Sequence, residues 1–308
     1  MTMNRRDILK AAVPAGLGIA MIPGLTTSIS AATTSAVIAT PARRPIYKSL
    51  KWGMVGEGGS VLEKFQMLLE LGYDGVELDA PGGPPNEELI AASKQTGLPI
   101  HGVVDSTHWN SRASDPDPAV REKCREDLIT AVKTSSAIGG SSVLFVPGHG
   151  KDGKWDEIKP RIDEVIVPVL PLAAKLGISI LIENVWNQLF YDSASGPEQS
   201  AQAYADFIDS FNSPWVGAYF DIGNHHKYGQ PEAWIRLLGK RIVKLDVKDF
   251  SRTENKFASL KKGTINWPAV REALDEIGYT GWCTAEVVGG KRDYLAQLLA
   301  DMKEILPN

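Results

Sequence analysis

The feature that most constrains this chain is an alternation of short apolar runs with longer amphipathic segments, repeated eight times. Short apolar runs bounded by turn residues are typical of buried strands, and apolar residues at helical spacing predict helices packed against them. The predicted strands are 51–55, 75–78, 99–104, 142–146, 179–183, 216–221, 242–247 and 282–287. The predicted helices are 61–71, 87–96, 119–138, 158–176, 198–211, 231–238, 268–277 and 292–306. Eight such units in about 260 residues favour an α/β fold, a (β/α)8 TIM barrel, over a doubly wound sheet.

The composition fits a globular chain with one large domain, expected at residues 49–308. The 308 residues are 43% hydrophobic and 23% charged, which excludes wholesale disorder and fibrous classes. The chain has 33 Lys and Arg against 37 Asp and Glu, a formal net charge of -4, and no long basic run. Nucleic acid is therefore not an expected partner. Two cysteines, Cys124 and Cys283, lack metal-ligand spacing and are expected to be unbridged.

The first 32 residues are expected to be a signal peptide rather than part of the fold. The pair Arg5-Arg6 precedes a weakly hydrophobic run, Ala11 to Leu25, and a stretch of small polar residues. This order resembles a twin-arginine signal, which exports folded proteins. The apolar run of about 15 residues is shorter than the roughly 20 that span a bilayer, so no stable membrane span is expected in the mature chain.

Cleavage of this segment is expected after residue 32, with positions 36 and 39 as alternatives. Residues 33–48 are then a linker into the barrel domain. The mature protein is expected to be exported, in the periplasm.

Acidic residues close four consecutive predicted strands. In a barrel of this type the active site lies at the carboxyl ends of the strands. Like charges gathered there repel unless protons or a cation intervene, and an all-oxygen set suits a hard divalent ion such as Mg²⁺ or Mn²⁺. Alternatively each carboxylate caps a helix or pairs with a lysine, because Lys244 and Lys248 share the face of Asp246. The candidate metal ligands are Glu183, Asp221, Asp246 and Glu286.

Six motifs in order along the chain carry a resemblance to a known family. They are residues 72–78 (GYDGVEL), 181–184 (LIEN), 220–224 (FDIGN), 241–249 (RIVKLDVKD), 263–268 (GTINWP) and 278–286 (GYTGWCTAE). Over residues 48–306 the chain resembles the xylose isomerase-like TIM-barrel superfamily, in its group of sugar and sugar-phosphate isomerases and epimerases. The resemblance implies that the four strand-end acids hold a metal. Asp246 stands where the family usually has His, which implies either weaker preference for softer metals or an altered or lost metal site.

The resemblance also implies chemistry by proton transfer. Isomerising or epimerising a sugar removes a proton beside a carbonyl and passes through an enediolate, whose charge a divalent ion stabilises. By resemblance, Glu183 and Glu286 are the catalytic residues that carry the proton. Which one is the acid and which the base stays open.

Seven further residues near predicted strand ends are candidates for substrate binding. Imidazole and indole side chains can bind hydroxyls and stack on a sugar face. Some sugar epimerases of the group have His three residues after the strand-six acid, where this chain has Asn224 followed by His225. The candidates are His108, Trp109, Glu77, Trp186, Asn224, His225 and Lys248.

Three functions remain open from the sequence. One is a divalent-metal-dependent sugar isomerase or epimerase acting on a small-molecule carbohydrate. Another is a lyase or dehydratase that uses the same metal site on a sugar or keto-sugar derivative, and the third is a non-catalytic carbohydrate-binding barrel. A phosphate-loop match at residues 148–154 is rejected because Trp155 stands where Ser or Thr is needed. The sequence leaves the oligomeric state open, a homo-oligomer included.

Overall fold

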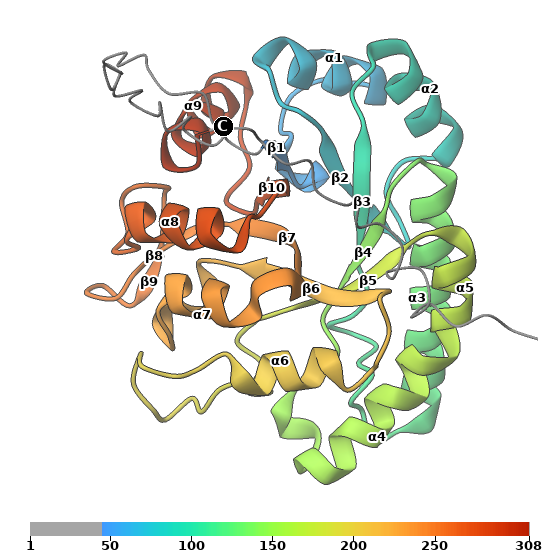
Figure 1. The fold of residues 1–308 in the computed structure, drawn as a ribbon. Coiled ribbons are helices and arrows are strands. Elements are labelled where there is room, and N and C mark those ends of the chain that lie inside the picture. The colour runs from blue at the N-terminus through green and yellow to red at the C-terminus, as the bar shows by residue number, and fades with distance from the viewer. Residues whose placement is uncertain (1–44, 308) are drawn as a thin grey trace, which may run out of the picture. The chain divides into compact units, whose positions relative to one another are not determined.

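A computed structural model describes residues 45–307, in which eight parallel strands form one sheet. These strands are β1 (Ile46–Leu50), β2 (Val76–Ala80), β3 (Ile100–Asp105), β4 (Ser142–Phe145), β5 (Ser179–Glu183), β6 (Val216–Asp221), β7 (Ile242–Val247) and β10 (Gly281–Ala285). Their order is β1-β10-β7-β6-β5-β4-β3-β2, and a bridge between Lys51 and Glu77 connects the two end strands. The nearly closed barrel with helices around it (Figure 1) confirms the predicted (β/α)8 fold.

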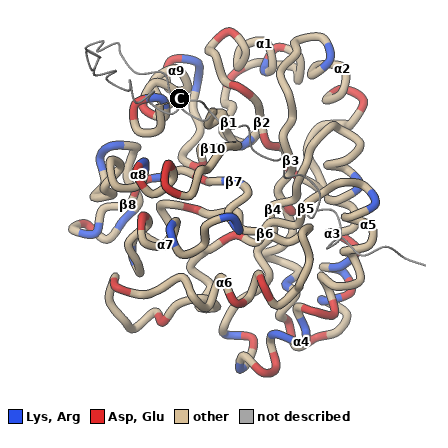
Figure 2. The backbone as a smooth tube through the Cα atoms, viewed as in Figure 1, with Lys and Arg blue, Asp and Glu red and all other residues tan. Residues whose placement is uncertain are grey.

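The helices outside the barrel are α1 (Val61–Leu71), α2 (Asn86–Thr96), α3 (Pro118–Ala137), α4 (Trp155–Ile166), α5 (Leu170–Leu176), α6 (Gln202–Asp209), α7 (Pro231–Leu238), α8 (Trp267–Ile277) and α9 (Arg292–Ile305). The ends of α1 are encoded locally. Ser60 accepts a hydrogen bond from the Glu63 amide at 3.2 Å, Glu63 accepts one from the Ser60 amide at 2.8 Å, and Gly72 ends the helix at φ 87°. No helix in the described part of the chain is both long and apolar enough to cross a membrane. Figure 2 shows basic and acidic residues interspersed along these helices.

Two predicted elements are corrected by the structure. The first strand is Ile46–Leu50 instead of 51–55, so residues 46–48 belong to the barrel and not to the linker. Residues 52–54 form a short 3-10 helix, η1 (Trp52–Met54). The single helix expected at 158–176 is divided into α4 and α5 by η3 (Val167–Val169), which contains Pro168. The predicted signal peptide and the linker up to residue 44 lie outside the described residues.

A hairpin that the sequence did not predict follows β7. Its strands are β8 (Asp249–Ser251) and β9 (Lys256–Ala258), which pair antiparallel. The hairpin precedes α8 and adds no strand to the barrel sheet. It therefore belongs to the loops at the carboxyl ends of the strands, where the barrel fold places its active sites.

Polar side chains from several strands point into the interior of the barrel. Tyr219 of β6 donates a hydrogen bond to Glu77 Oε2 at 2.9 Å and lies 2.7 Å from the hydroxyl of Thr284 on β10. Lys244 of β7 donates to the carbonyl of His101 at 2.6 Å. A Cβ on Gly102 would lie 2.8 Å from Lys244 Nζ, so glycine provides the space for this buried lysine. The main apolar core lies instead between the sheet and the helices.

Candidate metal and substrate site

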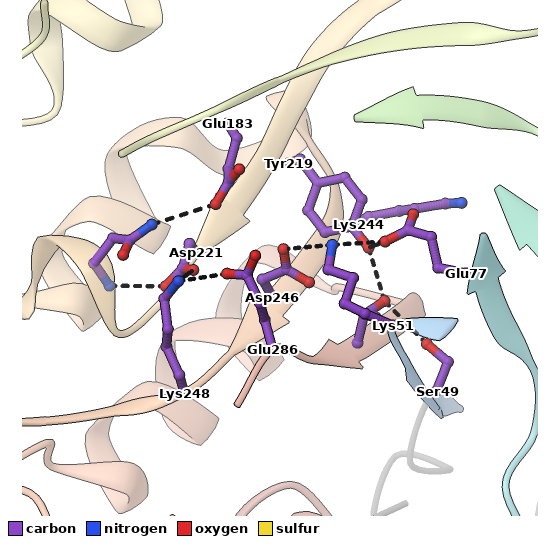
Figure 3. Close-up of polar contacts among 12 residues, drawn as sticks. Ser49, Lys51, Glu77, Glu183, Tyr219, Asp221, Lys244, Asp246, Lys248 and Glu286 are labelled. Carbon is purple, nitrogen blue, oxygen red and sulfur yellow. Dashed lines mark hydrogen bonds and ion pairs between the residues drawn. The ribbon is translucent and has the colours of Figure 1, made fainter. Parts of the chain in front are cut away.

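Four carboxylates meet at the carboxyl ends of neighbouring strands (Figure 3). Glu183 ends β5, Asp221 ends β6, Asp246 lies in β7 beside Asp221 in register, and Glu286 follows β10. One ligand atom from each residue lies within 4.8 Å of those of the other three. Three of these side chains are buried, and Glu286 is half-buried. The structure thus brings together the residues that the sequence predicted as metal ligands.

Crowding and burial disfavour the charged forms of these acids. Burial, followed by the charge of Glu286, raises the pKa of Glu183 well above its usual range. Burial also raises the pKa of Asp246, and that of Asp221 to about 6. Burial likewise opposes ionisation of Glu286, but the ammonium groups of Lys248 and Lys51 outweigh it and lower the pKa of that carboxyl. The cluster therefore holds more negative charge than its environment readily stabilises.

Two lysines partly compensate this charge. Lys248 Nζ lies 2.9 Å from Asp221 Oδ2 and also pairs with Glu286. Lys51 Nζ lies 2.8 Å from Asp246 Oδ2 and 2.7 Å from Glu77 Oε2. Figure 3 shows the two ammonium groups on either side of the carboxylate cluster. A Cβ on Gly223 would lie 2.5 Å from Lys248 Cγ, so glycine after β6 lets this lysine reach the cluster.

The residues present fit a hard divalent cation. The four candidate ligands offer only oxygen atoms, the donors that Mg²⁺ and Mn²⁺ prefer. Asp246 Oδ1 is buried and has no hydrogen-bond partner in the described part of the chain, which is costly for a carboxylate unless a proton or cation compensates it. The cluster thus contains a carboxylate oxygen without a hydrogen-bond partner, and its four carboxyl groups outnumber the two lysines that pair with them.

Two asparagines hold the strand ends that carry the acids. Asn184 accepts a hydrogen bond from the Asp221 amide at 2.7 Å and donates one to the Asp221 carbonyl at 2.8 Å. Asn224 donates from its side chain to Glu183 Oε1 at 3.3 Å, while its amide donates to Asp221 Oδ1 at 2.7 Å. The motifs at residues 181–184 and 220–224 therefore interlock, and this fixes two of the candidate ligands relative to each other.

A cavity of about 420 Å³ opens beside the cluster. Five of the predicted substrate-binding residues line it together with Glu183 and Glu286: His108, Trp109, Trp186, Asn224 and Lys248. Burial lowers the pKa of His108 to about 3, so its ring is neutral near pH 7. Because His108 Nδ1 accepts a hydrogen bond from the Val146 amide at 3.4 Å, the ring proton is assigned to Nε2.

Glu77 and His225, also predicted to bind substrate, do not line this cavity. Glu77 lies in the barrel interior between Lys51 and Tyr219. His225 is buried beside Trp234, with ring centroids 4.4 Å apart, and its Nδ1 lies 2.8 Å from Asn184 Nδ2. Their positions support structural roles instead of contact with a substrate.

The sequence reasoning missed two residues of the site. Lys51 directly follows β1, so a correct placement of that strand would have identified it as another strand-end residue. Phe257 of β9 lines the cavity and stacks on Trp186, with ring centroids 4.8 Å apart and an angle of 13° between the rings. No motif marks this phenylalanine, because the hairpin that carries it has no clear apolar pattern.

Comparisons with known proteins agree with this architecture. L-ribulose-5-phosphate 3-epimerase UlaE of Escherichia coli O1:K1 / APEC is 23% identical over 71% of this chain and 79% of its own length. The D-allulose 3-epimerase structure from Methylomonas sp. superposes with a TM-score of 0.69 at 17% identity, covering 85% of this chain and 99% of that one.

The structure of the 3-keto-D-glucoside 4-epimerase YcjR from E. coli gives a TM-score of 0.65 at 16% identity, covering 83% of this chain and 99% of that one. At such identities the likeness to solved structures shows the fold. The family model described as xylose isomerase-like TIM barrel matches residues 65–305. The chain belongs to the xylose isomerase-like TIM-barrel family.

Proposed function

We propose that this protein is a divalent-metal-dependent sugar epimerase or isomerase that works by proton transfer through an enediolate. The observation that carries the proposal is the gathering of four carboxylates within 4.8 Å beside a cavity of about 420 Å³. The relatives named above, which are epimerases of ribulose phosphate, allulose and a keto-glucoside, support the sugar class.

Glu183, Asp221, Asp246 and Glu286 would hold the cation. A divalent ion bound there supplies Lewis-acid stabilisation for negative charge on substrate oxygens. Lys51 holds the side chain of Asp246 in place, because its Nζ lies 2.8 Å from Asp246 Oδ2. Asn224 and Asn184 keep Asp221 and Glu183 at a fixed separation through the hydrogen bonds described above.

The proton is moved by carboxyl groups that also border the cavity. Glu183 and Glu286 both line it, whereas Asp221 and Asp246 lie deeper and do not. A carboxylate removes the proton from the carbon beside the carbonyl, and a carboxylic acid returns one at the same carbon on the other face or at the neighbouring carbon. The first outcome is epimerisation and the second is isomerisation.

Aromatic and neutral donor groups complete the pocket. Trp109 and Trp186 offer flat apolar surface for a sugar ring, and the His108 Nε2 proton can be donated to a substrate oxygen. Trp186 is held by its indole N–H, which donates to the Asn224 carbonyl, and by stacking on Phe257.

Deuterium exchange from solvent tests the proposal. Free ketoses and glycosides that carry a keto group on the ring are incubated in D₂O with Mn²⁺ or Mg²⁺, and NMR follows deuterium at the carbon beside the carbonyl. The wild type is expected to exchange at least one of these sugars. Glu183→Gln and Glu286→Gln should each slow exchange about a thousandfold, within the range for loss of a general acid or base. Glu87→Gln on α2, an exposed carboxylate away from the cavity, is the matched control.

Other outcomes point to the other functions. If the sugar loses an oxygen substituent instead of taking up deuterium as an intact molecule, the protein is a lyase. Binding of sugars without exchange at any carbon identifies a binding protein. Full exchange in both glutamine variants contradicts the assigned proton carriers.

A further inference from the structure

A second cavity, of about 410 Å³, adjoins the one beside the carboxylate cluster. The two cavities share Lys248, Phe257 and Glu286 in their linings. The second cavity extends from there over Val288 and Tyr294, which the first does not include. The site is therefore one continuous depression with two compartments. Glu286 borders both of them, whereas Glu183 borders only the first.

The second compartment is apolar and exposed. Val288 has 83% of its surface exposed, Phe257 44% and Tyr294 39%, and all three line the same cavity, so they form a contiguous apolar surface there. Phe257 is held from behind by Trp186 and by an edge-on contact with Phe250 at 5.6 Å. Its ring is thus fixed in orientation before any ligand arrives.

The charge of this compartment argues against a phosphate group. A bound phosphate needs cationic side chains or several free N–H donors. Among residues 45–307, the one basic residue lining the second compartment is Lys248, and its ammonium group already pairs with Asp221 and Glu286. Glu286 adds negative charge at the boundary. A neutral group with an apolar face fits these surroundings better.

We infer that the substrate is a glycoside, with its reacting sugar ring in the first compartment and its glycosidic substituent in the second. This inference rests on the proposed function. A glycosidic bond locks the anomeric carbon as an acetal, so that carbon offers no carbonyl for proton removal. The carbonyl must then stand on another ring carbon. A dehydrogenase-type reaction, which removes two electrons and two protons from a ring hydroxyl with a nicotinamide or flavin as acceptor, must supply the substrate.

The test compares affinities by calorimetry in the presence of Mn²⁺. The probes are 1,5-anhydro-3-keto-D-glucitol, which has the ring alone, phenyl 3-keto-β-D-glucopyranoside and 3-keto-cellobiose. Both glycosides are expected to bind at least tenfold more tightly than the ring alone. A stronger gain for the phenyl compound identifies an aromatic substituent as the natural occupant, and a stronger gain for 3-keto-cellobiose identifies a second sugar.

Val288→Trp fills the second compartment from an exposed position and leaves the carboxylate cluster unchanged. It should remove most of the glycoside advantage while the affinity for the ring alone changes less than twofold. Val167→Trp, at an exposed valine of η3 outside both compartments, is the matched control and should change neither.

Each outcome separates the two proposals. Two results would overturn the second compartment as a substituent site: equal affinities for the ring and the glycosides, or tighter binding of fructose 6-phosphate than of either glycoside. The proposed function still stands in both cases if deuterium exchange is observed. Preferential glycoside binding with no deuterium exchange for any probe overturns the proposed function and leaves a glycoside-binding site.

Discussion

At the scale of single residues, Lys51 neutralises two buried acids at once. It pairs with Asp246 and Glu77, both fully buried, and Asp246 stands where the resembling family usually has His. An imidazole is neutral when it binds a metal, whereas a carboxylate adds a charge that must be balanced inside the barrel. Lys51 supplies this balance, and it connects the polar interior of the barrel to the candidate metal site.

Replacing Lys51 by Met should therefore destabilise the protein strongly. Removing one partner of a buried ion pair leaves an uncompensated charge, and a loss of about 3 kcal/mol in the free energy of unfolding is expected at pH 7. The loss should shrink at lower pH, because burial raises the pKa of Asp246 and that carboxyl takes up a proton as the pH falls. Urea unfolding at pH 7 and at lower pH measures the loss in this variant. Lys262→Met, at an exposed lysine, is the control and is measured in the same way. Equal small losses in the two variants would contradict the role of Lys51.

Lys248 and a cation compete for the same oxygens. Lys248→Met removes the ammonium group that pairs with Asp221 and Glu286, so the cluster becomes more negative. The affinity for Mn²⁺ alone is expected to rise at least tenfold, about 1.4 kcal/mol. Electron paramagnetic resonance titration measures it. Lys256→Met, an exposed lysine of the hairpin, should leave the affinity unchanged. Weaker Mn²⁺ binding in Lys248→Met would show that the lysine assists the cation.

The raised pKa of Asp221 predicts a pH dependence of stability. Its folded value of about 6 lies above the ordinary 3.8, so the native state binds the proton more tightly than the unfolded chain. In metal-free protein its contribution to stability is greatest below pH 4 and is lost as pH rises to about 6, by about 2–3 kcal/mol.

Comparison with Asp221→Asn isolates this contribution. The free energy of unfolding of the wild type minus that of the variant should fall between pH 4 and pH 6 and then stay level. Denaturation in the presence of a chelator at several pH values measures the difference. A difference that does not change with pH would refute the assigned shift.

At the scale of elements, three strands that carry acids were predicted to the residue. β5 and β6 are mostly apolar runs that end in a carboxylate, and β7 carries its carboxylate at the position before its last residue, so their boundaries are well marked. β1 was misplaced because Lys48 and Ser49 face buried surroundings, so Ile46–Leu50 does not have the pattern of an apolar strand. The β8–β9 hairpin has one exposed aromatic residue and no alternation, so local sequence gave no signal for it.

The hairpin contributes to the pocket more than to stability. Phe257 is 44% exposed, so Phe257→Ser should cost less than about 1.5 kcal/mol in the free energy of unfolding. It borders both compartments, and affinity for the glycoside probes should fall at least tenfold. Calorimetry and urea unfolding on the same preparation test the two statements. Trp155→Ser, at an exposed aromatic residue outside both compartments, is the control for binding. Undiminished glycoside affinity in Phe257→Ser would contradict the assignment.

At the scale of the whole molecule, the family barrel is joined to an amino-terminal segment that we propose directs export. The argument rests on the order of its residues: Arg5-Arg6, an apolar run and small residues. Replacing both arginines by lysine should retain the protein in the cytoplasm of a bacterial host with an intact twin-arginine pathway. Cell fractionation followed by mass spectrometry of the amino terminus measures location and cleavage. Periplasmic material from the double variant would exclude this route.

The hairpin between β7 and α8 also separates two tasks along the chain. Glu183, Asp221 and Asp246 stand on strands of the barrel sheet and Glu286 directly follows one, while Phe257 and Val288 stand in segments outside the barrel sheet. If the proposed function holds, directed evolution toward new glycosides can therefore randomise residues 252–258 and 287–288 and keep the four carboxylates unchanged. Under the proposed function, substitutions in these segments would change which substrates bind while the residues that carry out the reaction stay the same.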